Sequence, residues 1–327
     1  SNGGKTMFFT SDRSRGKQRV YEIKKTEDGW TLPDDISGDV NDATQAGSAT
    51  FTPDGQYMIF AGYEHDVVGE GRTDLYSARK MKGKWVDVQN LGPAVNSAYW
   101  DSQPALSSDG NTLYFVSDRP GGEGGTDIYV SKRTREGWSR PENLRSINTS
   151  ANEMAPGIAY DNKSFTFASD RSGGKGGYDI YFVKGNNGSF GNPTNAGEPV
   201  NSASDDVFYF SVHNTDMAYF SSARSGGSGN LDVYTVVPNP FKTDAVVVVS
   251  GTVRDAKTQQ PLGATITITD LKNNSKVATL NSDDVTGNYY VVLQPGHTYS
   301  ITASRDGYLF YSERFEIPAN QGYKEIP

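Results

Sequence analysis

The sequence predicts an all-β protein: a five-bladed β-propeller over residues 1–237, a linker over residues 238–243 and a small seven-stranded β-sandwich over residues 244–327. The main observation is a repeat, because SDRPGGEGGTDIYV at residues 117–130 returns as SDRSGGKGGYDIYF at 169–182 and as SARSGGSGNLDVYT at 222–235. The composition of 15 Phe and 19 Tyr beside 36 Gly is typical of β-structure with many tight turns. The repeat is regular, since five tyrosines lie 55, 53, 52 and 53 residues apart: Tyr21, Tyr76, Tyr129, Tyr181 and Tyr234.

Each repeat predicts four short antiparallel strands. A small-residue segment such as SQPALSSDG forms the innermost strand, and an apolar run such as residues 112–116 forms the second. The glycine cluster supplies the positive φ angles of the hairpin that leads to the third strand, which carries Asp-Ile-Tyr. A large aromatic residue nine positions after each of the first four tyrosines marks the outer strand: Trp30, Trp85, Trp138 and Phe190. Three of them are followed by a proline, typical of an edge strand: Pro33, Pro141 and Pro193.

The two ends of the repeat series are incomplete. The innermost strand of the first unit would fall before residue 1. The last unit lacks its outer aromatic residue, because Thr243 stands nine positions after Tyr234, with only Phe241 nearby. The repeat stops at Val237-Pro238-Asn239-Pro240, where two prolines mark the linker. Beyond it, a β-branched run, alternating Thr and Ile and a Pro-Gly turn predict the sandwich.

Composition excludes several classes of function. The formal net charge of −8 disfavours nucleic acid and anionic lipid surfaces as partners. No stretch of 18 apolar residues is present, so we expect no transmembrane segment in this chain. The absence of cysteine excludes disulfides, thiol catalysis and cysteine–metal sites.

Two sets of motifs resemble known families. The SDR, GGxGG and D-I-Y motifs resemble TolB-like, or PD40, propeller repeats over residues 5–237. The segments GTVRD, QPLGA, TGNY and DGY, from residue 251 onward, are similar to the carboxypeptidase regulatory-like domain. Their order is similar to OmpA-family cell-envelope proteins of Bacteroidetes that take part in type IX secretion. The resemblance implies a periplasmic, outer-membrane-associated lipoprotein, partners among other cell-envelope or secretion-system proteins, and attachment to peptidoglycan through a domain outside this chain.

The charged residues of the repeat have a structural interpretation, because a motif present in every blade is expected to hold the blades together. We expect each SDR arginine to pair with the aspartate that precedes Ile-Tyr or its equivalent. The residues of the SDR motif are Asp12, Arg13, Asp118, Arg119, Asp170, Arg171 and Arg224, and the aspartates are Asp74, Asp127, Asp179 and Asp232.

Departures from the repeat supply the candidate partner-binding residues. The second unit has AGYEHD where others have SDR, so Tyr63, Glu64 and His65 are predicted to face a partner. Tyr99 and Trp100 precede an inner strand and could stack on a sugar or a peptide. For Trp100 the alternative is packing between blades.

No arrangement typical of catalysis is found in the sequence. A nucleophile elbow, a Walker loop and a zinc-binding helix are absent, and the glycine clusters lie between strands rather than before a helix. The pairs Asp205-Asp206 and Asp283-Asp284 lack the spacing of a calcium loop. We therefore expect no enzyme activity, no metal and no cofactor. The function predicted is a rigid periplasmic scaffold for protein contacts; the alternatives are a module that binds glycans or peptidoglycan fragments and, third, a sialidase-like hydrolase.

Overall fold

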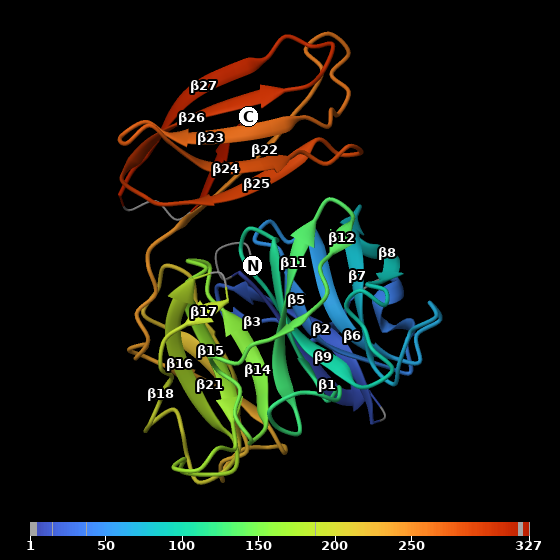
Figure 1. Cartoon of the computed structure of the whole chain (residues 1–327), viewed down its shortest axis with the longest axis vertical. Coiled ribbons are helices and arrows are strands. Elements are labelled where there is room, and N and C mark those ends of the chain that lie inside the picture. Colours follow the sequence, from blue (N-terminus) through green and yellow to red (C-terminus); the bar gives the residue numbers. More distant parts are fainter. Residues whose placement is uncertain (1–4, 15, 37, 187, 320–322, 327) are drawn as a thin grey trace. The chain divides into compact units, whose positions relative to one another are not determined.

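The protein is all-β and divides into two compact units, residues 1–243 and 244–327, in a computed structural model (Figure 1). The structure describes residues 5–14, 16–36, 38–186, 188–319 and 323–326. The one helix in these ranges is the 3₁₀ turn η2 (Asp39–Asp42). Accordingly, the described ranges contain no helix with the length and apolarity needed to cross a membrane.

The first unit contains five antiparallel sheets that follow one another in sequence order. The first consists of β1 (Thr6–Ser14), β2 (Lys17–Thr26), β3 (Gly29–Trp30) and β4 (Asp34–Asp35). The second consists of β5 (Gln45–Phe51), β6 (Tyr57–Tyr63), β7 (Asp74–Met81) and β8 (Lys84–Asn90). The third consists of β9 (Asp101–Leu106), β10 (Thr112–Ser117), β11 (Asp127–Thr134), β12 (Gly137–Trp138) and β13 (Glu142–Asn143). The fourth consists of β14 (Glu153–Ile158), β15 (Ser164–Ser169), β16 (Asp179–Asn186), β17 (Ser189–Phe190) and β18 (Thr194–Asn195). The fifth consists of β19 (Asp206–Ser211), β20 (Ala218–Ser222) and β21 (Asp232–Val236).

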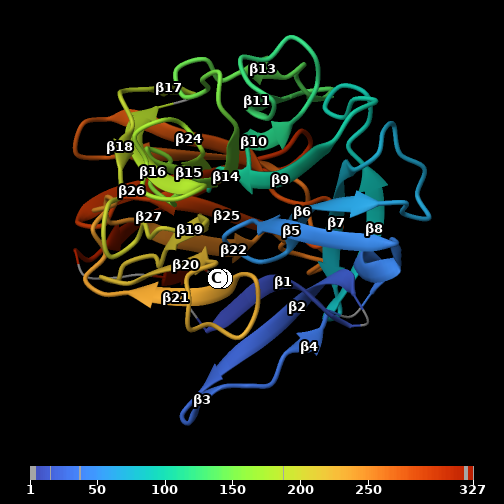
Figure 2. The same ribbon diagram turned by 90° about the horizontal axis from the view of Figure 1, so that it is seen from below.

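These sheets have a propeller-like arrangement. The first strands of the second to fifth sheets, β5, β9, β14 and β19, contact one another in succession and lie innermost (Figure 2). In the third, fourth and fifth sheets the second and third strands are joined by the glycine hairpin expected from the repeat, and Gly121, Gly173 and Gly226 in these hairpins have φ near 90°. The predicted all-β, propeller-like fold class is confirmed.

Proline decides whether an outer strand is continuous. In the first, third and fourth sheets, where a proline follows the aromatic residue, the outer strand is split into two pieces of two residues, such as β12 and β13 around Pro141. In the second sheet Val88 stands at the position of the proline, and β8 runs unbroken for seven residues. The difference follows from the missing N–H of proline, which cannot join the ladder.

Neighbouring sheets pack through alternate residues of each strand. In β10, Leu113 and Phe115 belong to the core shared with the second sheet, whereas Tyr114 and Val116 belong to the core shared with the fourth sheet. This alternation follows from the two-residue period of a strand. Each sheet between two others therefore buries apolar side chains on both faces.

The fifth sheet obtains its outer aromatic residue from the predicted linker. Phe241 is only 7% exposed and stacks on Phe182 of the fourth sheet, with ring centroids 4.4 Å apart. Asn239 is also buried, and its Oδ1 accepts a hydrogen bond of 2.6 Å from the Tyr209 hydroxyl. The assignment of residues 238–243 to a linker is therefore wrong for these side chains, which complete a core of the first unit.

The second unit is a sandwich of seven strands. One sheet has the order β25 (Asn288–Leu293), β22 (Val247–Thr252), β28 (Tyr323–Ile326). The other has the order β24 (Ser275–Asn281), β23 (Thr265–Asp270), β26 (His297–Ser304), β27 (Tyr311–Ile317). Ile266 and Ile268 of β23 and Val247 and Val249 of β22 provide side chains to the core between the sheets.

Phe241→Ala is expected to lower the free energy of unfolding by about 3–5 kcal/mol, because it removes a buried ring from the core between the fourth and fifth sheets. Phe210→Ala, which truncates a half-exposed ring of the same sheet, is the matched control and should cost about 1 kcal/mol or less. Urea unfolding followed by tryptophan fluorescence measures both, since all four tryptophans lie in the first unit. Equal losses would contradict the role given to Phe241.

Candidate functional site

Three of the four arginines of the SDR motif pair with acids at the start of the innermost strands. The expected pairing with the aspartate before Ile-Tyr is wrong, because that aspartate is held by the hairpin instead. Each arginine also donates to a backbone carbonyl and lies over two aromatic rings of its own hairpin. Three pairs share this geometry, Arg119 with Asp101 at 2.5 Å, Arg171 with Glu153 at 2.9 Å and Arg224 with Asp206 at 2.9 Å.

The acids that pair with these arginines are buried. Their role was not predicted from the sequence. The carboxylates of Asp101, Glu153 and Asp206 are 0% exposed, and each also accepts hydrogen bonds from Ser or Thr. Asp206, considered above as a calcium ligand, therefore uses its carboxylate within the fold. The signal was present in the sequence, since each acid stands 18 residues before its arginine. This spacing is hard to recognise in the sequence, because the acid is Asp in two of the units and Glu in the other.

The aspartate of the SDR motif binds the same end of the inner strand. Asp118 accepts the N–H of Trp100 at 2.7 Å, and Asp170 accepts the N–H of Asn152 at 2.7 Å. In each case the donor is the residue directly before the buried acid. Asp and Arg of one motif thus hold two successive residues of an inner strand.

The aspartate that begins the third strand organises the glycine hairpin. Asp127 accepts the N–H groups of Glu123 at 2.7 Å and Gly124 at 3.2 Å, and Asp74, Asp179 and Asp232 accept equivalent bonds. At Gly122 an added Cβ would collide with the Asp127 carboxylate, which explains the second glycine of the motif.

The predicted partner-binding residues of the second sheet differ in their exposure and in the contacts that their side chains make. Tyr63 is exposed at the end of β6. His65 stacks on Tyr76 with centroids 5.0 Å apart, and its Nδ1 accepts the Val67 N–H at 3.0 Å. Glu64 accepts a hydrogen bond from Thr44. The side chain of His65 therefore has a structural role in the loop between β6 and β7.

The other predicted pair lies at the far end of that same loop. The carbonyl oxygen of Tyr99 accepts the Arg72 N–H at 3.3 Å, and Trp100 forms a β-bridge with Thr73. Tyr99 is exposed, whereas Trp100 packs against the core between the third and fourth sheets. The loop thus connects the two predicted regions, and their role in binding a partner stays a prediction.

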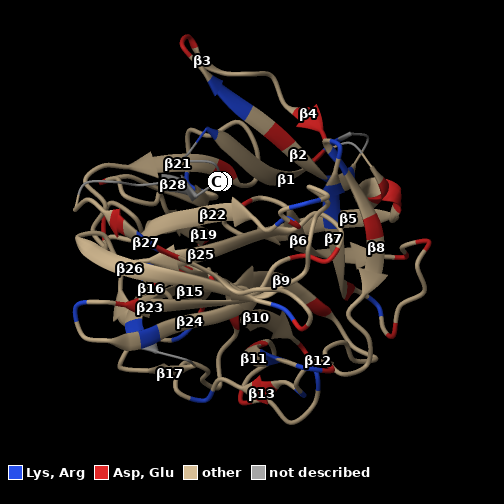
Figure 3. Cartoon of the chain, turned by 90° about the horizontal axis from the view of Figure 1, so that it is seen from above, with Lys and Arg blue, Asp and Glu red and all other residues tan. Residues whose placement is uncertain are grey.

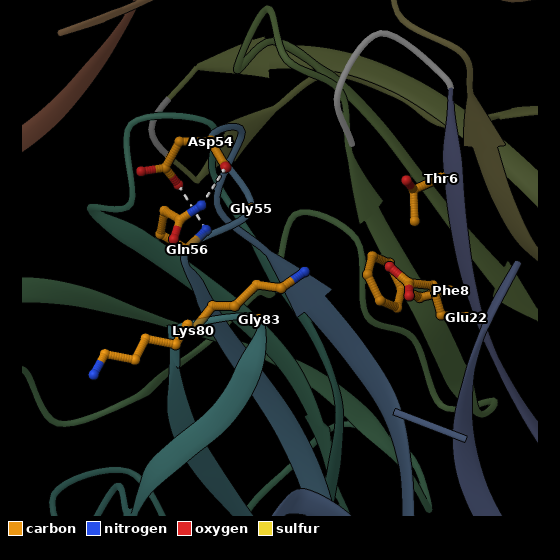
Figure 4. Close-up of a pocket in the computed structure, with 9 residues that line it drawn as sticks. Thr6, Phe8, Glu22, Asp54, Gly55, Gln56, Lys80 and Gly83 are labelled. Atoms are coloured by element: carbon orange, nitrogen blue, oxygen red, sulfur yellow. Dashed lines mark hydrogen bonds between the residues drawn. The ribbon is translucent and has the colours of Figure 1, made fainter. Parts of the chain in front are cut away.

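A cavity with a volume of about 190 Å³ lies between the first and second sheets (Figure 4). Its two carboxylates stand on opposite walls, where Asp54 bonds to Gln56 and Glu22 pairs with Lys24 at 3.2 Å. Burial raises the pKa of Asp54. The lining residues are Thr6, Phe8, Glu22, Asp54, Gly55, Gln56, Lys80, Lys82 and Gly83, with Phe8 the one aromatic residue among them.

One face of the fifth sheet is apolar and exposed. Tyr209, Ala218 and Phe220 pack toward the fourth sheet. On the other face, Phe208 is 40% exposed, Phe210 48% and Val233 54%. In the earlier sheets, the equivalent face packs against the next sheet along the chain.

The first and fifth sheets form the two ends of the series (Figure 2). In the described ranges, the strands of the first sheet make no extensive contact with β19, β20 or β21. The first sheet has Lys and Arg residues in β2 and acidic residues in the turn before β3 and in β4, so both signs of charge occur in it (Figure 3).

Comparison with known proteins identifies similar folds. No protein-family model matches the chain, and no curated protein matches it in sequence. A puromycin-hydrolysing peptidase of Mycobacterium tuberculosis is 12% identical with a TM-score of 0.38, over 92% of this chain and 51% of that chain. An exo-β-1,3-galactanase from Clostridium thermocellum is 12% identical with a TM-score of 0.46, over 97% and 82%. An α-L-arabinofuranosidase from Podospora anserina, in complex with cellotriose, is 10% identical with a TM-score of 0.41, over 70% and 85%.

These structures correct one expectation. The conclusion that the chain is not an enzyme is wrong, because the propeller-like structures similar to it include a peptidase and two glycan-active enzymes. The fold class thus gives no ground for excluding catalysis. The likeness concerns the fold and assigns none of these activities to this chain, which spans about half the length of the puromycin-hydrolysing peptidases.

Arg171→Ala is expected to lower the free energy of unfolding by about 3–5 kcal/mol, because it leaves the buried Glu153 carboxylate without its cation. Arg13→Ala, in the same motif of the first sheet, is the control and should cost about 1 kcal/mol or less, since that side chain is exposed. Urea unfolding followed by tryptophan fluorescence separates the two. Similar losses would refute the structural importance of the buried acid.

Asp54→Asn is expected to change the pH dependence of stability. A carboxyl group whose pKa is raised above its usual 3.8 stabilises the fold when protonated. This contribution is complete below the unfolded-state pKa and is lost as pH rises through the folded-state pKa. The stability of the native chain relative to the Asn variant should therefore decrease as pH rises, as measured by urea unfolding over a pH series. A relative stability that increases with pH would contradict the raised pKa.

Proposed function

We propose that this chain is the protein-contact part of a periplasmic, outer-membrane-associated protein of the OmpA family of Bacteroidetes. The proposal is supported by the order of the two sets of motifs, propeller repeats followed by a regulatory-like domain, which is similar to that of PorE of the type IX secretion system. Its partners would be other cell-envelope or secretion-system proteins. Attachment to peptidoglycan would take place through a domain outside this chain.

The observation that carries the protein-contact role is the exposed apolar face of the fifth sheet. Phe208, Phe210 and Val233 are exposed on this face, although equivalent positions in the preceding sheets are covered. Contiguous exposed apolar surface is typical of a protein interface, and aromatic residues are enriched at the centres of such interfaces. A glycan site would instead be expected to offer a roomy pocket lined by tyrosines. The cavity of about 190 Å³ has no tyrosine in its lining, and the cavity lined by Tyr160 and Tyr209 has a volume of only about 20 Å³.

A photo-crosslinking amino acid in place of Phe210 tests this proposal in cells. Because residue 210 is half exposed on the proposed interface, we expect ultraviolet light to join the chain to one or a few envelope proteins, identified by mass spectrometry. The control places the same amino acid at Leu32, an exposed apolar residue between β3 and β4 of the first sheet.

The result has three informative outcomes. Envelope proteins crosslinked at residue 210 and not at residue 32 support the proposal. No protein crosslink at residue 210, or the same proteins at both positions, contradicts it. Glycans or muropeptides retained by the purified chain, without a protein crosslink, would favour the glycan-binding alternative.

A further inference from the structure

The loop between β26 and β27 exposes apolar side chains at consecutive positions. Leu309 is 97% exposed and Phe310 72%, and the half-exposed Tyr308 and Tyr311 stand on either side of them. In the described ranges, no other two neighbouring residues both have large apolar or aromatic side chains that are exposed. Exposed apolar residues that occur singly are normal on a protein surface, whereas a continuous group is typical of a binding surface. This loop is therefore a candidate binding surface outside the propeller repeats and the fifth sheet.

The base of the loop is fixed by hydrogen bonds. The Arg305 carbonyl oxygen accepts the Tyr308 N–H at 3.1 Å, which closes a turn in which Gly307 has a φ of 83°. The Arg305 side chain donates to the Gly263 carbonyl oxygen at 3.0 Å, and its guanidinium lies 5.8 Å from the centroid of the Tyr308 ring. The turn therefore fixes the direction in which the chain leaves β26, and the apolar residues follow it before β27 begins.

Three loops come together at this end of the second unit (Figure 1). Thr265 at the start of β23 pairs with Asn281 at the end of β24 and with Ser304 at the end of β26, so the adjoining loops are neighbours. The loops cover residues 253–264, 282–287 and 305–310. Together they contain three basic and four acidic residues. Their charges nearly balance, whereas a surface that binds anionic lipid is strongly basic.

The order of the side chains along the loop fits the boundary between water and lipid. Leu309 and Phe310 carry no polar group, and a tyrosine stands on each side of them. Tyrosine prefers such a boundary, because its ring is apolar while its hydroxyl can stay in contact with water or headgroups. Before the first tyrosine, Arg305 and Asp306 carry opposite charges. These two charges complement the phosphate and the ammonium group of a zwitterionic lipid.

The protruding shape of the loop favours a lipid surface over a protein partner. Leu309 is almost completely exposed, so hardly any of its side chain contacts its own unit. A protein would need a pocket of complementary shape to receive it, whereas fluid lipid adapts to any protruding apolar group. Leu309 and Phe310 stand outside the β-ladder that begins at Tyr311, so their backbone groups depend on water. The loop can therefore enter the hydrated interface of a lipid layer, but not its hydrocarbon core.

We propose that the loop between β26 and β27 inserts into the surface of a zwitterionic phospholipid layer. Leu309 and Phe310 lie among the upper parts of the acyl chains, and the two flanking tyrosines lie at the level of the headgroups. The inference goes beyond the protein-contact function and does not rest on it, because the loop belongs to the second unit and the apolar face of the fifth sheet to the first. Binding of this kind is weak and reversible, since two apolar side chains bury less surface than one long acyl chain.

The test measures how residues 1–327 sediment with sucrose-loaded vesicles of phosphatidylcholine and phosphatidylethanolamine at a series of lipid concentrations. We expect the bound fraction to rise with the lipid concentration. The double variant Leu309→Ser, Phe310→Ser should lower the partition coefficient by roughly tenfold or more, because the apolar surface that leaves water is lost. Both side chains are exposed, so circular dichroism should give this variant the same midpoint of thermal unfolding as the native chain.

The matched control is the double variant Leu32→Ser, Val68→Ser, which removes two highly exposed apolar side chains from the first unit. It should bind the vesicles as the native chain does. Because the contact is apolar, a higher salt concentration should leave binding unchanged. The inference is overturned if the native chain does not bind these vesicles or if the two double variants bind equally. It is also overturned if binding requires anionic lipid and is lost at high salt.

Tryptophan fluorescence tests which part of the chain enters the lipid. All four native tryptophans belong to the first unit, so Phe310→Trp introduces a tryptophan into the loop of a unit that otherwise has none. With vesicles, the emission of this variant should shift to shorter wavelength. Lipids brominated in their upper acyl chains should quench it more strongly than they quench the native chain. Equal quenching of the two chains would show that the loop stays in water and that the inference is wrong.

Two other occupants of the loop would also overturn the inference. A photo-crosslinking amino acid at residue 309 that joins the chain in cells to an envelope protein, and not to lipid, would make a protein the partner. Analytical ultracentrifugation should give a monomer, since a dimer that the Leu309→Ser, Phe310→Ser variant dissociates would make a second copy the occupant. Neither result changes the crosslinking at residue 210, which tests the protein-contact function separately.

Discussion

Each sheet of the first unit has apolar side chains on both faces, and it needs a neighbouring sheet on each face to bury them. Apolar side chains alternate along every central strand, so a sheet such as the third buries one set against the second sheet and the other against the fourth. A sheet at the end of the series has the same alternating sequence but only one neighbour. The exposure of Phe210 and Val233 follows directly from this constraint, because their strands are built as if another sheet were present.

The ion pair between the buried acid and the SDR arginine helps to fix the register of each inner strand relative to the neighbouring hairpin. Burying an ion pair gains little free energy by itself, because desolvation offsets the attraction. The pair does, however, fix which residue of an inner strand stands opposite the end of the hairpin. Asp118 and Arg119 together hold two successive residues at the start of β9, which a shift of one residue would separate. Such a shift would also turn the apolar side chains to the other face of the sheet, so the ion pair and the apolar packing specify the same register.

The residues selected from the sequence as candidates for binding a partner have different surroundings in the structure. The sequence argument looked for departures from the motif, and it selected Tyr63, Glu64 and His65. The His65 side chain is engaged within its own loop. Arg13 and Phe208, in contrast, follow the repeat and belong to its first and last sheets.

The sequence by itself determined the period, the glycine hairpins, the interruption of the outer strands at Pro33, Pro141 and Pro193, and the change of fold near residue 240. These are local properties, since a glycine with positive φ or a proline without N–H acts within a few residues. Only the tertiary structure decided which acid meets Arg119, Arg171 and Arg224, and that Phe241 completes a core of the fifth sheet. Those outcomes depend on where separate strands meet, which no spacing within one strand defines.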